Sequence, residues 1–434
     1  MNTTQLKDRI DWVTVLLFTV ISLIGVYAIF SVEYKGGAIF ANLGKSYNKQ
    51  LLWFGISLVA GFAIVLTDSR LYSNLAFGSY VIGFFLLILV LFVHENVRGS
   101  QSFLPLGFVR FQPGELMKVC TALTLSKFIS TQGINFANNT QHRMLALAMV
   151  FVPCVLVILS NETGLALVYF SFLLAMYREG LPRAILFVGF SIILLVILTL
   201  VLHKTTLLII LCVLLAIEFV ILRKQIMRSR ELLIVSVAVF LLAVGFSQVA
   251  VPLAFKKVLQ PHQVDRIYTL LGRDVPAEYL NANYTKSGMS DYNVKQSKIA
   301  IGSGGFWGKG PLNGTQTSGN FVPEQSTDFI FCSIGEQFGF VGCVILIGLY
   351  LGLLYRIVFI AERQKSKFSR IYAYCVAGIV FFHLTINVSM TMGIAPVIGI
   401  PLPMLSYGGT SLLTFAGMLF IMVRLDADRN SVIR

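Results

Sequence analysis

Long blocks of apolar residues, rather than an alternation of polar and apolar positions, dominate this sequence. A block of about 20 apolar residues is long enough to cross the hydrocarbon core of a bilayer as a helix. Twelve candidate blocks follow one another along the chain, at residues 12–30, 51–67, 73–93, 115–131, 143–160, 164–177, 183–203, 205–222, 232–250, 329–355, 371–391 and 405–424. The pattern predicts an all-α, polytopic integral membrane protein with about twelve transmembrane helices.

The composition agrees with this interpretation. Charged residues make up 12% of the 434 residues and hydrophobic residues 56%, whereas soluble domains carry roughly 25% charged residues. A soluble enzyme, a disordered chain and a disulfide-stabilised secreted domain are therefore excluded. The formal net charge of +14 is poor evidence for nucleic-acid binding, because Lys and Arg in membrane proteins set topology first. We expect membrane lipid, and no nucleic acid, around the chain.

The distribution of Lys and Arg predicts the orientation. With the N-terminus inside, nineteen of these residues fall in short cytoplasmic loops and termini. Six fall in short outer loops, namely Lys35, Lys45, Lys49, Arg98, Arg110 and Lys204. Because cytoplasmic loops carry the excess of Lys and Arg, both termini are predicted to be cytoplasmic. Residues 1–250 then hold nine N-terminal helices, 251–327 form a large extracytoplasmic loop, and 328–434 hold the C-terminal helices.

Charged residues inside apolar spans are costly, so each is a candidate for function. Glu115 and Lys118 lie three residues apart on one helical face, where they can pair. This spacing is equally compatible with a structural ion pair and with a ligand site. Glu336 follows the outer loop and could face a cavity, whereas His383, on an apolar helix, fits a packing histidine better than a proton relay.

Two stretches interrupt helices at membrane depth. One is SNETGLAL at 160–167, and the other is the Pro- and Gly-rich sequence at 393–413, in which we expect a re-entrant segment at 393–410. Non-helical backbone at this depth is tolerated where it is buried in protein or lines a wet cavity. Both stretches therefore predict a polar interior, which a transporter and a membrane-embedded enzyme would explain equally well.

Four long motifs resemble those of the SEDS family, the proteins of shape, elongation, division and sporulation. They are FQPGE at 111–115, KIAIGSGGFWGKGPLNGTQT at 298–317, NFVPEQSTDFIF at 320–331 and GIPLPMLSYGGTSLL at 399–413. The resemblance covers most of the chain in the family's order. The wording of the second and third motifs favours the elongation branch of the family over its division branch.

The resemblance implies a peptidoglycan glycosyltransferase that polymerises lipid II on the outer face of the bacterial cytoplasmic membrane. The 4-hydroxyl of an acceptor sugar attacks C1 of the donor, forms a β-1,4 link and releases undecaprenyl diphosphate. Such chemistry needs a carboxylate to take the hydroxyl proton and cationic groups at the leaving diphosphate. It admits a divalent cation, Mg²⁺ or Mn²⁺, although the sequence holds no dedicated ligand cluster. The implied partner is a class B penicillin-binding protein, a transpeptidase.

The family's essential aspartate lies in the outer loop, just before the IGSGG motif. Asp274, followed by Pro276, is the better match, and Asp291, which precedes Tyr292, is its rival. Either residue also fits an ordinary solvated loop aspartate. Seven further residues are candidates for substrate binding by the same resemblance: Arg110, Glu115, Lys118, Glu162, Lys309, Glu324 and Ser406.

The chain departs from the family pattern at three places. Where the family often has an Arg-Trp pair in an outer loop, this sequence has Ser102 and Phe103, so a charged contact is lost. The family's PDLGTA becomes NETGLA, so Glu162 takes the acidic place and Gly164 is retained. Family members commonly have ten spans, and we expect the extra pair within 183–250.

Three alternatives to a lipid II polymerase of cell elongation stay open at this point. The first is a lipid II flippase, which the intramembrane charges would suit, although no convincing internal repeat of the transporter kind is present. The second is a division-specific paralogue with the same chemistry. The third is a non-catalytic scaffold that activates a partner.

Overall fold

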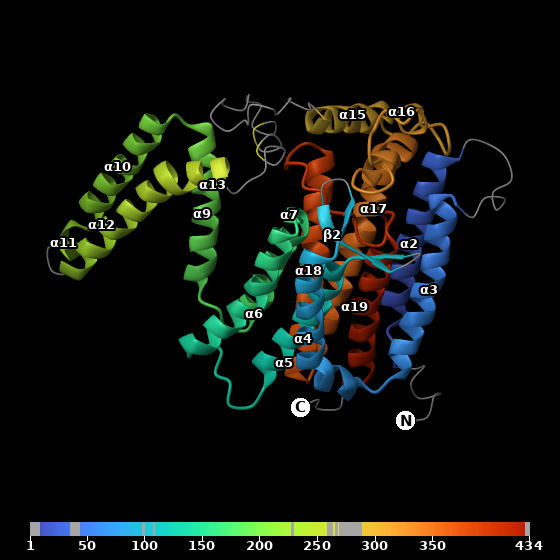
Figure 1. Ribbon diagram of the computed structural model, residues 1–434, viewed down its shortest axis with the longest axis horizontal. Helices are drawn as coiled ribbons and strands as arrows, with labels where there is room; N and C mark the ends of the chain where they lie inside the picture. Colours follow the sequence, from blue (N-terminus) through green and yellow to red (C-terminus); the bar gives the residue numbers. More distant parts are fainter. Residues whose placement is uncertain are drawn as a thin grey trace. The chain divides into compact units, whose positions relative to one another are not determined.

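The computed structural model describes residues 9–34, 44–97, 100–106, 109–226, 230–257, 264, 268 and 289–429 (Figure 1). The chain forms two compact units. The first consists of Met1–Leu181 together with Asn293–Arg434, and the second is Pro182–Tyr292.

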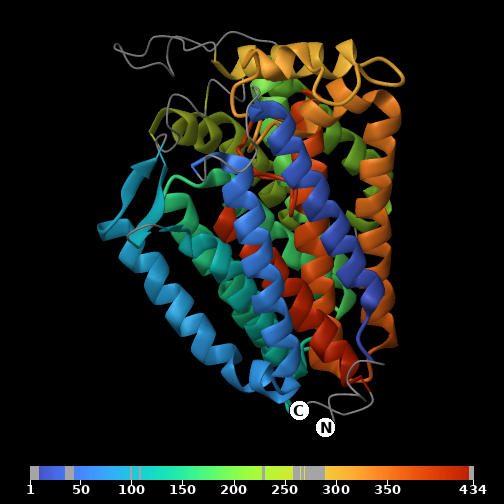
Figure 2. The ribbon, with the colours of Figure 1, turned by 90° about the vertical axis from the view of Figure 1, so that its right-hand side faces the viewer.

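The first unit is a bundle of helices with one small sheet. Its N-terminal elements are α2 (Trp12–Glu33), α3 (Ser46–Leu66), α4 (Ser69–Phe92), β1 (Glu95–Val97), β2 (Ser100–Leu106), β3 (Val109–Phe111), α5 (Pro113–Ser130), α6 (Thr140–Leu159), α7 (Thr163–Val168), the 3₁₀ turn η1 (Tyr169–Ser171) and α8 (Phe172–Arg178). Its C-terminal elements are α15 (Met289–Ser303), which belongs to this unit from Asn293 onward, α16 (Thr315–Ser318), α17 (Ile330–Arg363), α18 (Lys367–Thr391) and α19 (Gly409–Ala427). Both ribbon views show α15 and α16 lying across the end of the bundle where α17 begins (Figures 1 and 2).

The second unit holds α9 (Arg183–Val201), α10 (Lys204–Ile221), α11 (Arg223–Ile226), α12 (Arg230–Gly245), the π-helical turn η2 (Phe246–Ala250) and α13 (Val251–Lys257). Its long helices bury few side chains within the protein, which is typical of helices that face lipid on most sides. Within α10, the intramembrane carboxylate of Glu218 accepts a 2.7 Å hydrogen bond from the Ser236 hydroxyl of α12.

The polytopic all-α class is confirmed, but the count of twelve spans is not. Among the residues that the structure describes, ten helices are long and apolar enough to cross a membrane. The two other predicted spans are also helical. One is α5, and the other is the short segment Thr163–Arg178, which η1 divides into two.

The low hydropathy of α5 has a structural cause. Fifteen of its 18 residues are buried, and they include the polar side chains of Glu115, Lys118 and Thr121. A helix enclosed by other helices does not need an apolar face toward lipid, so its polar groups can pair inside the protein. The central position of α5 thus explains why hydropathy alone undervalues it.

The three-stranded sheet between α4 and α5 was not part of the sequence prediction. Its order is β1-β2-β3, with antiparallel pairs such as Leu104 opposite Phe111. In β2 the side chains alternate, because Ser102 and Leu104 are buried while Pro105 is exposed. Figure 2 shows the sheet at the end of α4. The short strands lie between two long apolar blocks, which hid this alternation.

A network of ion pairs joins the bundle at the end where α2 begins and α19 ends (Figures 1 and 2). Arg356 of α17 donates to both carboxylate oxygens of Asp11 at 3.1 Å. Arg363 donates to Asp426 at 2.8 Å and also lies 3.4 Å from Asp11. These contacts tie three helices that are distant in the sequence.

We predict that Asp11→Asn destabilises the bundle at neutral pH by about 1–3 kcal/mol, because it removes a charge-assisted hydrogen-bond acceptor from Arg356. Burial by itself raises the pKa of Asp11, but hydrogen bonds from Arg356 and Thr14 hold that pKa below the ordinary 3.8. A carboxyl with a lowered folded-state pKa stabilises the fold fully above its unfolded value and loses this contribution as pH falls. The difference between wild type and variant should therefore shrink below pH 3.8.

Thermal unfolding in detergent at pH 7 and at acidic pH measures this difference. Asp68→Asn is the matched control, because exposed Asp68 caps α4 by accepting from the backbone N–H of Arg70. Asn is as good an N-cap as Asp, so this variant should unfold like wild type. If the stability loss in Asp11→Asn did not depend on pH, the ionised Asp11 carboxylate would not be its cause.

Candidate active site

The charged pair on α5 is buried in the bundle. Pro113 and Glu115 occupy the first turn of the helix, where proline and an acidic residue are both favoured. The Lys118 Nζ atom lies 3.1 Å from Glu115 Oε1 and 3.0 Å from Oε2. Lys118 is 0% exposed and Glu115 2% exposed. The ion pair expected from the spacing of Glu115 and Lys118 is confirmed, and both side chains are buried inside the bundle.

His383 of α18 completes this group, which we call the charged cluster (Glu115, Lys118 and His383). Its Nε2 atom lies 2.9 Å from Lys118 Nζ, and its Nδ1 atom lies 3.1 Å from the carbonyl oxygen of Pro401. The sequence interpretation as a packing histidine missed this bridge. A histidine on an apolar helix carries no sign of partners that are 265 and 18 residues away.

Glu162, at the start of α7, accepts hydrogen bonds from the Ser102 hydroxyl and from Gln112 Nε2, the latter at 3.2 Å. Ser102 stands where the family often has arginine, and Glu162 stands where it has aspartate. The two departures from the family pattern therefore meet in space. In this chain a neutral hydroxyl donor on β2 contacts the carboxylate of Glu162.

The Pro- and Gly-rich segment at 393–408 lies against α7 and α18. A Cβ atom added to Gly164 would come within 2.8 Å of the Ile398 carbonyl oxygen, so this close approach requires glycine. Asn387, one turn after His383, donates to the carbonyl oxygens of Ile400 at 2.7 Å and Asp328 at 2.8 Å. Of the segment predicted at 393–410, residues 393–408 are non-helical and residues 409 and 410 begin α19. Side chains of the bundle bind its backbone.

The NFVPEQSTDF loop packs onto the same segment. The Ser406 hydroxyl donates to the Thr327 carbonyl oxygen at 2.6 Å and accepts from the Leu402 N–H at 2.8 Å. Glu324, whose φ of 56° is in the left-handed region, accepts from the Thr327 hydroxyl at 2.9 Å. Ser406 and Glu324 are thus brought close through Thr327.

Lys309 belongs to a second group, centred on Glu336 of α17. The fully buried Glu336 carboxylate accepts from Lys309 Nζ at 2.7 Å and from the backbone N–H groups of Gln316 and Thr317 at 2.8 and 2.9 Å. The Thr317 hydroxyl adds a bond of 2.8 Å. Glu336 therefore anchors the GKGPLNGTQT loop, a role that its position within an apolar run did not reveal.

The other predicted site residues lie elsewhere in the fold or outside the described residues. Arg110 is exposed on β3, opposite Pro105. Asp274 lies outside the described residues, and Asp291 lies in α15 with a side chain that is not described. Within the described ranges, no three His, Cys, Asp or Glu side chains gather as a metal site needs. A magnesium or manganese ion at the diphosphate stays a prediction.

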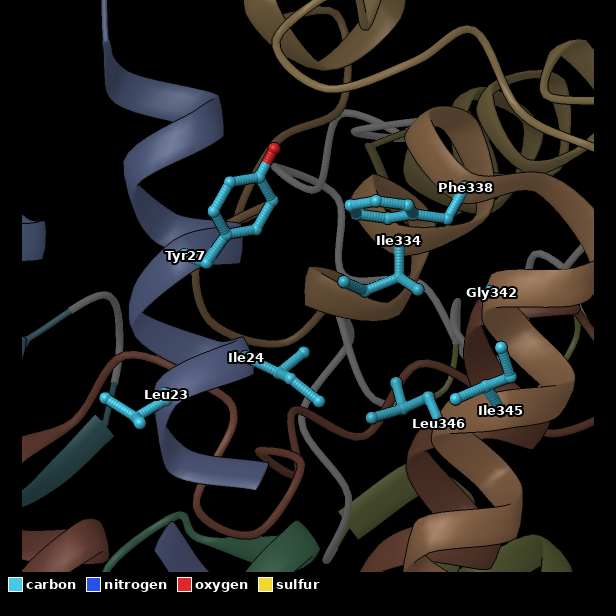
Figure 3. A pocket seen from close by; sticks show the side chains of 8 residues that line it. All are labelled: Leu23, Ile24, Tyr27, Ile334, Phe338, Gly342, Ile345 and Leu346. Atoms are coloured by element: carbon cyan, nitrogen blue, oxygen red, sulfur yellow. The ribbon is translucent and has the colours of Figure 1, made fainter. Parts of the chain in front are cut away.

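An apolar cavity of about 400 Å³ lies between α2 and α17 (Figure 3). It is lined by Leu23, Ile24, Tyr27, Ile334, Phe338, Gly342, Ile345 and Leu346. The rings of Tyr27 and Phe338 are 5.8 Å apart across it. No charged side chain lines this cavity, so it suits a hydrocarbon group.

The comparisons with known proteins identify the family. A model described as "Cell cycle protein", for FtsW, RodA and SpoVE, matches residues 8–231 and 202–431. The chain belongs to this family. The SEDS resemblance seen in the motifs is therefore confirmed, and the chain is a multi-pass membrane protein of the SEDS family.

Two curated relatives are named as enzymes. The chain is 30% identical over 361 residues to the peptidoglycan glycosyltransferase MrdB of Escherichia coli K12, which covers 83% of this chain and 80% of that protein. It is 30% identical over 446 residues to the peptidoglycan glycosyltransferase RodA of Treponema pallidum, which covers 94% and 96%. These SEDS relatives are similar along nearly the whole chain.

Two solved structures share the fold. A chain of a peptidoglycan synthase complex, described as coordinating polymerization and crosslinking, has a TM-score of 0.64 at 24% identity and covers 97% of this chain and 98% of its own. RodA of Thermus thermophilus has a TM-score of 0.62 at 22% identity, with coverage of 97% and 98%. The SEDS fold therefore extends over both units of this chain.

We predict that Glu336→Ala destabilises the protein by about 2–4 kcal/mol, because it leaves the Lys309 ammonium and two backbone N–H groups without their acceptor. Thermal unfolding in detergent measures the loss. The GKGPLNGTQT loop should also become more sensitive to protease.

Glu362→Ala is the matched control, since Glu362 pairs with Arg178 at 3.2 Å while both side chains are half exposed. An exposed ion pair contributes less than about 1 kcal/mol to the free energy of unfolding. Equal stability of the two variants would show that Glu336 does not anchor the loop.

Proposed function

We propose that this chain is a peptidoglycan glycosyltransferase that polymerises lipid II into glycan strands, with release of undecaprenyl diphosphate, for cell elongation and rod shape. The observation that carries the proposal is the convergence of family motifs. The FQPGE, NFVPEQSTDF and GIPLPMLSYGG segments meet in one polar region of the bundle, through the side chains of Lys118, His383, Asn387 and Ser406. The activity named for the MrdB and RodA relatives supports the same reaction.

In the proposed reaction, Asp274 takes the proton from the 4-hydroxyl of the acceptor sugar as that oxygen attacks C1 of the donor. General-base catalysis of this kind contributes about 10²- to 10⁴-fold to a rate. Arg110, with an exposed side chain, is a candidate for contact with the leaving diphosphate. Glu162, Lys309, Glu324 and Ser406 are further candidates for substrate contacts.

The burial of Lys118 limits what its ammonium group can contact. Its ammonium group is enclosed by Glu115 and His383 and is 0% exposed. Direct contact with a diphosphate therefore requires one of these bonds to open. Without such opening, Lys118 acts on the site through the position of its partners.

The lipid part of the substrate needs an apolar surface beside the site. The 400 Å³ cavity between α2 and α17 is lined by hydrocarbon groups, and is our candidate for a segment of the polyprenyl tail. Burial of each CH₂ group contributes about 0.8 kcal/mol, so even a short stretch of tail would hold the substrate.

The proposed orientation places both termini in the cytoplasm and the reaction at the outer face of the bacterial cytoplasmic membrane. The excess of Lys and Arg in the predicted cytoplasmic loops supports it. We propose a class B penicillin-binding protein as the partner, because a fold neighbour comes from a complex described as joining polymerization to crosslinking.

We predict that Asp274→Ala abolishes polymerisation of purified lipid II by the purified protein, with a loss of at least about 10²-fold, because the acceptor hydroxyl loses its base. Gel analysis of the glycan product measures the activity, and thermal unfolding verifies the fold. Asp291→Ala, in the same segment 251–327 that the sequence predicts to be extracytoplasmic, is the control and should retain activity.

The other outcomes separate the alternatives. Loss in Asp291→Ala alone would move the base to that residue, and full activity of both variants would refute a loop base. Wild-type protein that translocates labelled lipid II in vesicles without making polymer would support a flippase. Inactive wild type that still stimulates a bound transpeptidase would support a scaffold. Rescue of division but not of rod shape in a depleted strain would favour the division paralogue.

A further inference from the structure

The hydrogen bonds of His383 determine which ring nitrogen carries its proton. The Pro401 carbonyl oxygen can only accept, so Nδ1, at 3.1 Å from it, must be the donor. In a neutral ring Nε2 then has a free lone pair, which faces the Lys118 ammonium at 2.9 Å. The imidazole therefore bridges two groups: it accepts a hydrogen bond from the Lys118 ammonium and donates one to the Pro401 carbonyl oxygen.

The surroundings keep the ring neutral and fix its orientation. A second proton on Nε2 would set an imidazolium against the Lys118 ammonium, with two cationic donors facing each other. The Glu115 carboxylate lies on the far side of the ammonium, at 3.0 and 3.1 Å. Phe415 of α19 packs edge-on against the His383 ring, with centroids 5.1 Å apart, and lies 5.2 Å from Lys118 Nζ.

The hydrogen bond from His383 to Pro401 ends in the GIPLPMLSYGG motif. The Pro401 carbonyl lies one residue after Ile400, whose carbonyl Asn387 holds, and five residues before Ser406, which binds the NFVPEQSTDF loop. His383 and Asn387 are four residues apart on α18, so one helical face holds two successive carbonyl groups of this segment.

We propose that His383 is a positioning residue, which transmits the fixed position of the Lys118–Glu115 pair to the Pro401 carbonyl and so sets the 399–408 segment against the NFVPEQSTDF loop. The proposal rests on the proposed function for its effect on turnover, while the geometry of the bridge can be tested without activity. It needs no contact between His383 and the substrate.

Kinetics of lipid II polymerisation test the effect on turnover. His383→Phe keeps an aromatic ring but removes both hydrogen bonds, and should lower kcat about 10- to 100-fold while KM for lipid II changes less than about threefold. His383→Gln keeps one acceptor and one donor at the end of a side chain of similar reach, and should restore activity to within about threefold of wild type. Loss in both variants, or in neither, would overturn the proposal.

A double-mutant cycle tests whether His383 acts through Lys118. Lys118→Met removes the ammonium and keeps the chain length. If His383 transmits the position of Lys118, adding His383→Phe to Lys118→Met should lower kcat less than about threefold further. Full additivity of the two losses would contradict a shared bridge.

¹⁵N NMR of histidine-labelled protein in lipid nanodiscs tests the bridge without turnover. Of the five histidine signals, the one that disappears in His383→Gln should show protonated Nδ1 and bare Nε2 at pH 7. Protonation at Nε2, or on both nitrogens, would refute the bridge. If wild type makes no polymer, the proposed function fails, whereas the bridge is still decided by this spectrum.

Discussion

The burial of the Lys118 ammonium group constrains the centre of this protein. A cation with no exposed surface in an apolar bundle is stable when acceptors surround it, and here Glu115 and His383 provide them. Each acceptor fixes an element: Glu115 belongs to the first turn of α5, and His383 to α18. One ring nitrogen of His383 accepts a hydrogen bond from Lys118, and the other donates one to the Pro401 carbonyl oxygen. A single buried charge thus lies where two helices and one irregular segment meet.

The irregular segment at 393–408 depends on the helices around it. It has no ladder of its own, so its carbonyl groups need donors from side chains. Asn387 binds Ile400, and Gln50 of α3 binds the Ser406 carbonyl oxygen at 3.2 Å. Ser406 in turn binds Thr327. Polar side chains in the spans therefore support backbone that could not exist in contact with lipid, and this irregular backbone is what brings the family's motifs together.

Two buried or half-buried carboxylates, Glu162 and Glu336, bind neighbouring segments through hydrogen bonds. Ser102 and Glu162, which stand at two of the positions where the motifs differ from the resemblance, contact each other. The Glu336 carboxylate accepts hydrogen bonds from five donors of the GKGPLNGTQT loop, including Lys309. In both cases, a carboxylate organises a neighbouring loop through hydrogen bonds that require close approach.

The sequence by itself determined the class of the protein, because blocks of apolar residues have the length that a bilayer imposes and this length is a local property. It also predicted the Glu115–Lys118 pair, since residues three apart on a helix are neighbours. Tertiary structure decided the rest: the burial of α5 on all sides, the small sheet at β1–β3, the anchoring role of Glu336 and the partners of His383. Lys118 and His383 are 265 residues apart, and no local pattern encodes which helices pack together. Contacts of this kind follow from the packing of the whole bundle, which brings each buried polar group to the acceptor or donor that it needs.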